Sequence, residues 1–126
     1  MFIWDVEADV WSRGPDMITA RTLTMATVYN NKIYVIGGSG GADSNTAVES
    51  YNVLTNEWQA ETSLPDSRWQ SLAAAPVGGG RIYAVGGNSN GGALATIVSL
   101  PVVDTPEVAS KSANESASTT SRSSRN

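Results

Sequence analysis

Two segments of this chain share a short apolar run that ends in a pair of glycines. They are Lys32–Gly38 (KIYVIGG) and Arg81–Gly87 (RIYAVGG), which lie 49 residues apart. A run of this length is too short for a typical helix and suits a buried strand, in which Tyr and Ile are favoured. A glycine after the strand permits a positive φ and the close approach of a second backbone. We therefore expect a repeated unit whose second strand ends at a Gly-Gly pair.

Other markers repeat with nearly the same period. The segments Trp4–Trp11 and Tyr51–Trp58 lie 47 residues apart, and the same spacing relates Arg21 to Arg68. The spacing then grows to 49, so two residues are inserted within 75–80, which predicts a loosened hairpin turn. A period near 50 with several short strands in each unit is typical of β-propellers.

The combined pattern resembles the kelch repeat over roughly residues 3–103. The pattern is an arginine, an apolar strand, Ile-Tyr-x-x-Gly-Gly, and then a tyrosine followed after six residues by a tryptophan. The repeats look most similar to those of kelch-like adaptor proteins, because Met17 stands four residues before Arg21. Bacterial kelch domains look similar too. The resemblance implies an all-β fold, a kelch-type β-propeller fragment of about two blades followed by a disordered Ser-rich tail.

The predicted domain organisation is a kelch region at residues 1–103 and a disordered tail at 104–126. The kelch region divides into a partial blade at 2–13, a full blade at 22–60 and a three-stranded blade at 69–103. In the third blade the counterpart of Trp58 is Glu107, so a fourth strand is missing there. The expected strands are Phe2–Val6, Val10–Arg13, Leu23–Tyr29, Lys32–Ile36, Ala47–Val53, Glu57–Ala60, Trp69–Ala75, Arg81–Val85 and Thr96–Val103.

A closed propeller needs about four to eight blades, and this sequence supplies little more than two. One expectation is that the chain is a fragment of a longer propeller or a truncated gene product. The other is a homo-oligomer that completes the propeller. In that arrangement the N-terminal strand pair of one chain replaces the strand that contains Pro101 in a neighbour, and three chains close a six-bladed ring.

Composition excludes several kinds of function. The net charge of −4 argues against a nucleic-acid surface, and no apolar stretch approaches the roughly 20 residues of a membrane span. The chain has no His and no Cys, which removes a histidine base, a cysteine nucleophile and the usual zinc ligand sets. We expect no catalytic residue, no metal, no cofactor and no enzyme activity. The start of the chain is unlike a signal peptide, so a cytoplasmic location is the default expectation.

Loops on a rigid scaffold carry recognition, so we expect contacts to a partner from the loops 39–46 and 88–95 and from the connectors 13–21 and 61–68. The repeated arginines have an alternative role, which is to bind carbonyl groups or a carboxylate of the next blade. The repeated aromatic residues Trp11, Trp58, Tyr34, Tyr83 and Tyr51 are expected to pack between blades. Trp69 has no repeat partner and is a better contact candidate. The candidate binding residues are Arg21, Ser39, Asp43, Ser44, Arg68, Trp69, Asn88 and Asn90.

The function most consistent with this pattern is binding of another protein. The resemblance to kelch-like adaptors implies substrate recognition for a ubiquitin ligase. Two alternatives stay open at this point. One is a piece of a catalytic kelch propeller, similar to a sialic-acid epimerase, and the other is a truncated fragment without function.

The first prediction concerns the tail. Residues 109–126 are rich in Ser and Thr and contain no bulky apolar side chain, so they have nothing to bury. Removal of these residues is expected to leave the melting temperature unchanged. A lower melting temperature in the shortened chain, measured by circular dichroism, would contradict this prediction.

Overall fold

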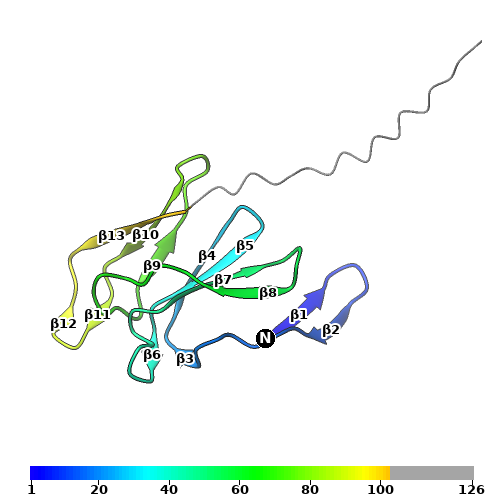
Figure 1. Ribbon diagram of the computed structural model, residues 1–126, viewed down its shortest axis with the longest axis horizontal. Coiled ribbons are helices and arrows are strands. Elements are labelled where there is room, and N and C mark those ends of the chain that lie inside the picture. Colours follow the sequence, from blue (N-terminus) through cyan, green and yellow to red (C-terminus); the bar gives the residue numbers. More distant parts are fainter. Residues whose placement is uncertain (103–126) are drawn as a thin grey trace, which may run out of the picture.

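A computed structural model describes residues 1–102 and consists of short antiparallel strands joined by turns and loops (Figure 1). All nine predicted strands are present, and the predicted tail at 104–126 lies outside the described residues. Within residues 1–102, no helix is long and apolar enough to cross a membrane. The strands are β1 (Phe2–Asp5), β2 (Val10–Arg13), β3 (Arg21–Thr22), β4 (Met25–Tyr29), β5 (Lys32–Ile36), β6 (Ser39–Gly40), β7 (Val48–Asn52), β8 (Glu57–Ala60), β9 (Leu72–Ala74), β10 (Arg81–Val85), β11 (Asn88–Ser89), β12 (Gly92–Ala93) and β13 (Ile97–Pro101).

The strands form one complete blade and two partial ones. The complete blade is the four-stranded sheet with the order β4-β5-β7-β8, and the next blade is the three-stranded sheet β9-β10-β13. The N-terminal hairpin β1-β2 pairs Trp4 with Trp11, which is the register that pairs Tyr51 with Trp58 in β7-β8. The hairpin therefore corresponds to the third and fourth strands of a blade, as the repeat predicts.

The turns follow the residues that the sequence places in them. Asn30 and Asn31 join β4 to β5 with φ values of 48° and 57°, in the left-handed region that Asn tolerates better than most residues. The inserted residues lie in the turn between β9 and β10, where Gly78 and Gly80 also have positive φ. Both hairpins are thus closed by residues suited to their backbone conformation.

Among the described residues, one hydrophobic core lies between the two larger sheets. It draws on β4, β5 and β7 of the complete blade, on β10 and β13 of the next, and on the connector between them. The innermost strands β4 and β9 also contact each other. The buried members are Met25, Tyr34, Ile36, Val48, Leu64, Ile82, Ala84 and Leu100.

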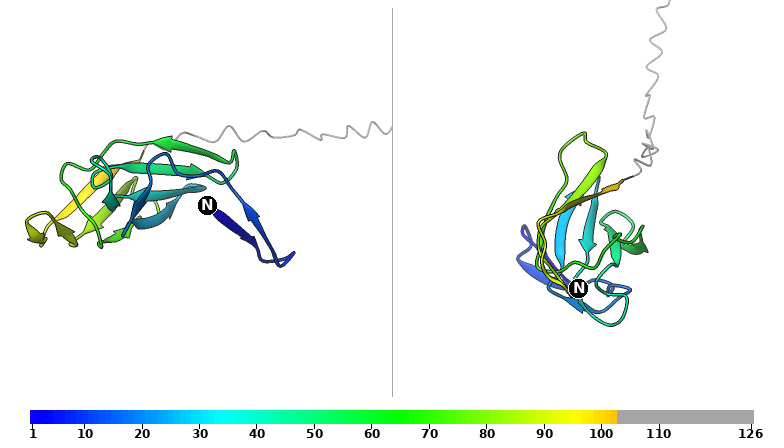
Figure 2. Two further views of the ribbon diagram at one scale, coloured as in Figure 1. Left: turned by 90° about the horizontal axis from the view of Figure 1, so that it is seen from below. Right: turned by 90° about the vertical axis from the view of Figure 1, so that its left-hand side faces the viewer.

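The hairpin β1-β2 does not share this core, and it projects from the rest of the molecule (Figure 2). Trp11 is 66% exposed and stacks only on Trp4, at a centroid distance of 6.1 Å. The expectation that Trp11 packs between blades is therefore wrong for this structure, because no sheet among the described residues covers that face. By contrast Tyr34 and Tyr51 are buried, and Trp58 and Tyr83 are half-buried.

Gly37 permits close contact between the two blades. The amide of its neighbour Gly38 donates to the carbonyl oxygen of Arg68, in the connector to the next blade, at 2.9 Å. Gly37 has a φ of 56°, and a Cβ atom there would collide with the same carbonyl oxygen. Gly86 has a similar φ of 62°, but a Cβ atom there would lie 3.4 Å from the nearest atom, the Leu94 carbonyl oxygen.

This difference between two equivalent glycines gives a matched pair of variants. Gly37→Ala and Gly86→Ala both place a side chain at positive φ, but only the first also meets a neighbouring backbone. We expect Gly37→Ala to lose about 1–3 kcal/mol more stability than Gly86→Ala, as overpacked sites do. Urea denaturation of the two variants measures the difference. Equal losses would contradict the role assigned to Gly37.

Candidate functional site

Four segments of the two repeats meet at one end of the molecule and form what we call the loop face. These segments are residues 21–24, 39–46, 68–71 and 88–95, and they carry the small strands along the lower edge of Figure 1. Strand β3 pairs with β6, and β11 pairs with β12. Trp69 and Asn88 form an isolated bridge. Each connector is thus paired with the loop that follows the Gly-Gly pair of its own repeat.

Arg21 lies beneath this face and binds the backbone of its own blade. Its Nη1 donates to the carbonyl oxygens of Ala47 (2.5 Å) and Gly37 (3.3 Å), and its Nη2 donates to that of Val35 (3.1 Å). The side chain has no exposed surface. Burial lowers the pKa of the Arg21 guanidinium below its ordinary value, and the nearby Glu49 carboxylate opposes this shift.

Glu49 completes this network and holds the connector that enters the blade. One carboxylate oxygen lies 3.4 Å from Nη2 of Arg21, and the side chain is only 2% exposed. The two oxygens also accept the backbone N–H groups of Ile18 (3.0 Å) and Thr19 (2.9 Å). The buried carboxylate therefore has both an ion-pair partner and hydrogen bonds, as a buried charge requires.

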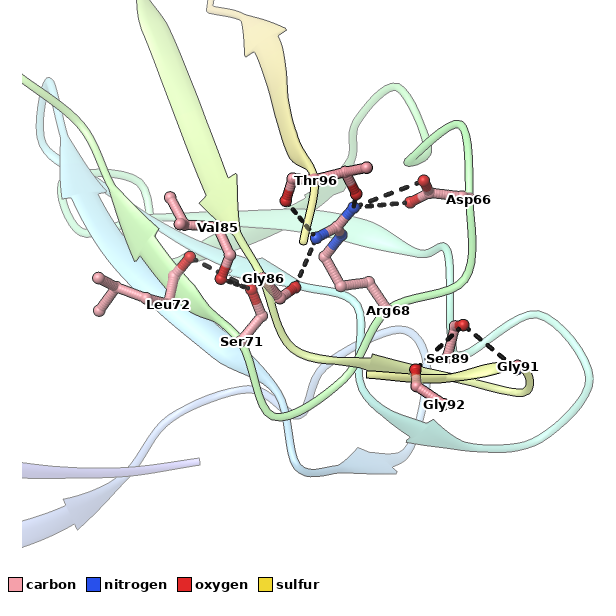
Figure 3. Close-up of polar contacts among 10 residues, drawn as sticks. All are labelled: Asp66, Arg68, Ser71, Leu72, Val85, Gly86, Ser89, Gly91, Gly92 and Thr96. Atoms are coloured by element: carbon pink, nitrogen blue, oxygen red, sulfur yellow. Dashed lines mark hydrogen bonds and ion pairs between the residues drawn. The ribbon is translucent and has the colours of Figure 1, made fainter. Parts of the chain in front are cut away.

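Arg68 repeats the arrangement in the next blade (Figure 3). Its Nη1 donates to the carbonyl oxygens of Gly86 and Thr96, and its Nη2 donates to the Thr96 hydroxyl at 2.8 Å. The acidic partner differs, because Val98 stands at the position of Glu49 and Asp66 on the connector takes its place at 3.3 Å. Asp66 is 45% exposed, so this ion pair is open to solvent on one side.

Three of the predicted contact residues are therefore corrected. Arg21, Arg68 and Ser44 have fully buried side chains, which leaves no surface for a partner to touch. Both arginines bind carbonyl groups, as the structural alternative predicts, but those groups belong to their own blade and not to the next one. Ser44 shapes the loop 41–46, because its hydroxyl donates to the Gly41 carbonyl oxygen at 2.7 Å.

The other five candidates lie on the loop face. Asp43 and Asn90 are exposed, while Ser39, Trp69 and Asn88 are half-buried. The backbone groups of Trp69 and Asn88 exchange hydrogen bonds of 3.0 Å and 2.9 Å. The structure brings Trp69 and Asn88 together and leaves Asp43 and Asn90 on separate loops, and their part in binding stays a prediction.

Two residues of this face were not predicted from the sequence. Leu23 and Gln70 each follow a repeated arginine by two residues, and both have positive φ, at 53° and 50°. The N–H of Gln70 donates to the Leu23 carbonyl oxygen at 3.0 Å and so joins the two blades. Both side chains are exposed. Both residues stand two positions after a repeated arginine, and this shared position was the only sign of them in the sequence. Leu and Gln rarely adopt a left-handed backbone conformation, so their residue types did not indicate one.

The side chains of the loop face can make both polar and apolar contacts with another molecule. Among residues 1–102, no group of three or more His, Cys, Asp or Glu side chains could hold a metal ion. The exposed groups are an acid, amides, a leucine and part of an indole ring, contributed by Asp43, Asn90, Gln70, Leu23 and Trp69.

Comparison with known proteins agrees with this architecture. The family model described as Kelch motif matches residues 20–65, which contain the complete blade. Alpha-scruin of Limulus polyphemus is 36% identical over 87 residues, which cover 68% of this chain. The chain belongs to the kelch-repeat family. Kelch-like protein 40 of Xenopus laevis is 34% identical over 61% of the chain, and an F-box/kelch-repeat protein of Arabidopsis thaliana is 33% identical over 71%.

The matched kelch repeats are a small part of each relative. They cover 9% of alpha-scruin, 12% of Kelch-like protein 40 and 24% of the F-box/kelch-repeat protein. The similarity therefore identifies kelch repeats in this chain. It does not show that the chain shares the activities or partners of those larger proteins.

The two arginine networks predict unequal responses to loss of the acidic partner. Glu49→Ala leaves the buried guanidinium of Arg21 without its counter-charge and two backbone N–H groups without their acceptor, so we expect a loss of about 3–5 kcal/mol. Asp66→Ala removes a partly exposed partner and is expected to cost less than about 1 kcal/mol. Urea denaturation of both variants measures the two losses. Similar losses in the two blades would show that the exposure of the acid does not matter.

Proposed function

We propose that this chain is a protein-binding module and that the loop face is its contact surface. The observation that carries the proposal is the pair of buried arginine networks beneath that face. Arg21 and Arg68 bind carbonyl groups at the ends of the strands, close to where the loops 39–46 and 88–95 begin. Recognition loops need such support, because ordering them on binding would otherwise cost affinity.

The composition of the face supports a protein partner over a small ligand. Leu23 is 49% exposed, and Trp69 is half-buried with its backbone fixed by Asn88. An anchored aromatic residue beside an exposed aliphatic one, ringed by amides, is typical of protein interfaces. Asp43 gives the rim a negative charge, so a partner with a basic group opposite that loop fits best.

A finer role, substrate recognition for a ubiquitin ligase, is part of this proposal. It rests on the resemblance to kelch-like adaptors and on relatives named Kelch-like protein 40 and F-box/kelch-repeat protein. We propose a cytoplasmic location on the same grounds. Closure of a ring by three chains stays a prediction, and light scattering on the purified chain would test it.

The contact surface can be tested without knowing the natural partner. Peptides selected from a displayed random library against the full chain are expected to bind the loop face. Asn90→Lys and Asp43→Lys are then expected to weaken the selected peptides about tenfold or more, because each places a new charge within the interface. The measurement is titration by fluorescence polarisation.

A matched control lies in the turn between β7 and β8, outside the loop face. Thr55 is exposed there, so Thr55→Lys introduces the same charge away from the proposed interface. It is expected to leave binding unchanged. Selected peptides that respond to Thr55→Lys and ignore both loop-face variants would overturn the proposed contact surface.

A further inference from the structure

Three apolar residues form a row across one face of the complete blade. Met25 pairs with Ile36, and Ile36 pairs with Val48, so their side chains lie on the same side of the sheet. All three are buried in the core, where the next blade packs against them. The row therefore forms one half of the contact between the two blades.

The next blade repeats this row on its outward face. The repeat spacing gives Leu72, Val85 and Ile97 as the counterparts, and β10 pairs Val85 with both of the others. These side chains are 65%, 37% and 63% exposed, so no residue among 1–102 buries them. Tyr83 lies on the same side of β10, two residues before Val85. We call these four residues the blade face.

The other half of the contact between blades has exposed counterparts as well, on the hairpin β1-β2. In the three-stranded blade, every second residue from 98 to 102 lies in the core or packs against it. The repeat spacings of 47 and 49 relate these residues to Phe2, Trp4 and Val6, which are all exposed. Trp11 stacks on Trp4 and widens this apolar surface. We call these four residues the hairpin face.

A pair of opposite charges accompanies the two faces. In the complete blade, Lys32 lines a cavity between the blades together with Pro101. The counterpart of Lys32 is Arg81, on the same side of β10 as Tyr83, and the counterpart of Pro101 is Asp5, at the end of β1. Both charged side chains are exposed. If the hairpin face packs on the blade face as one blade packs on the next, a guanidinium meets a carboxylate.

The two faces lie at opposite ends of the molecule. The hairpin (blue) stands at one end of Figure 1, and the three-stranded blade (green to yellow) stands at the other, with the complete blade between them. One copy therefore cannot bring its own two faces together, whereas two copies can. A second copy supplies the apolar residues and the acid at the matching positions, which makes it the occupant that fits the blade face.

We propose that the chain associates head to tail, with the hairpin face of one copy packed on the blade face of the next. Trp4 takes the place that Leu100 has within one chain, and Asp5 pairs with Arg81. Strand β13 keeps its pairing with β10, so no strand is exchanged. The contact joins two different surfaces, which makes it heterologous. It lies on sheet faces, away from the loop face, and does not depend on the proposed function.

The first test is the mass of the purified full chain at several concentrations, measured by light scattering and sedimentation velocity. We expect species larger than 13.2 kDa that dissociate on dilution. Trp4→Glu and Ile97→Glu are each expected to weaken association at least about tenfold, because each places a charge within an apolar contact. Leu54→Glu is the matched control, since Leu54 is exposed in the turn between β7 and β8 and belongs to neither face. Circular dichroism confirms that each variant is folded.

Mixing the two weakened variants tests whether the contact is heterologous. The Trp4→Glu chain keeps an intact blade face, and the Ile97→Glu chain keeps an intact hairpin face. An equimolar mixture is therefore expected to recover a complex of one copy of each, which cannot grow further. A contact between two identical surfaces would show no such recovery.

The charge pair is tested by a double-mutant cycle. Asp5→Asn keeps an acceptor for the N–H groups of Glu7 and Ala8, which bind the Asp5 carboxylate at 3.0 Å and 2.9 Å. Asp5→Asn and Arg81→Gln are each expected to weaken association about two- to fivefold, and the two together no more than either alone. Asn90→Lys is expected to have no effect, which separates this contact from the loop face.

Three results would overturn the proposal. One is a chain that stays monomeric up to about 1 mM, where even weak specific complexes form. The second is association that both Trp4→Glu and Ile97→Glu leave unchanged, which would assign it to another surface. The third is a mixture of these two variants, each folded and monomeric, that recovers no complex.

Discussion

The structure depends on two arginines that are buried where strands end. A blade must turn sharply after its second strand, and an arginine donates to the carbonyl group of the first glycine at this turn and to a carbonyl group just before the third strand, which also accepts a backbone N–H group. Arg21 and Arg68 satisfy these carbonyls with the several donors of a planar guanidinium, an arrangement that lysine could not reproduce. The cost is a buried charge in each blade, and the Nε atom of each arginine has no partner in the described part of the chain.

Contacts within one repeat were the most predictable from the sequence. The apolar runs before Gly37 and Gly86 identified the second strands, and Asn30-Asn31 identified a tight turn, because each depends on neighbouring residues alone. Two-residue strands such as β3 and β6 were not predicted, since a pair of residues carries no periodic pattern. The hairpins β1-β2 and β7-β8 have the same register, in keeping with the repeat of their two segments.

Contacts that depend on a distant segment were predicted poorly. The ion pair of Arg21 with Glu49 joins a connector to a strand, and nothing in the spacing of these residues marks them as partners. The burial of Trp11 failed for a related reason, because a repeat specifies which face is apolar but not whether another sheet covers it. Of the candidate binding residues, the three whose side chains are buried are those whose side-chain polar groups bind the protein's own backbone.

The single proline of β13 has a consequence for solubility. An exposed strand edge can template further copies of itself, which is how strands recruit one another into fibrils. Pro101 interrupts the row of outward N–H groups at one end of the edge, so stacked identical strands would lose a hydrogen bond in every layer. An edge of this kind resists open-ended growth.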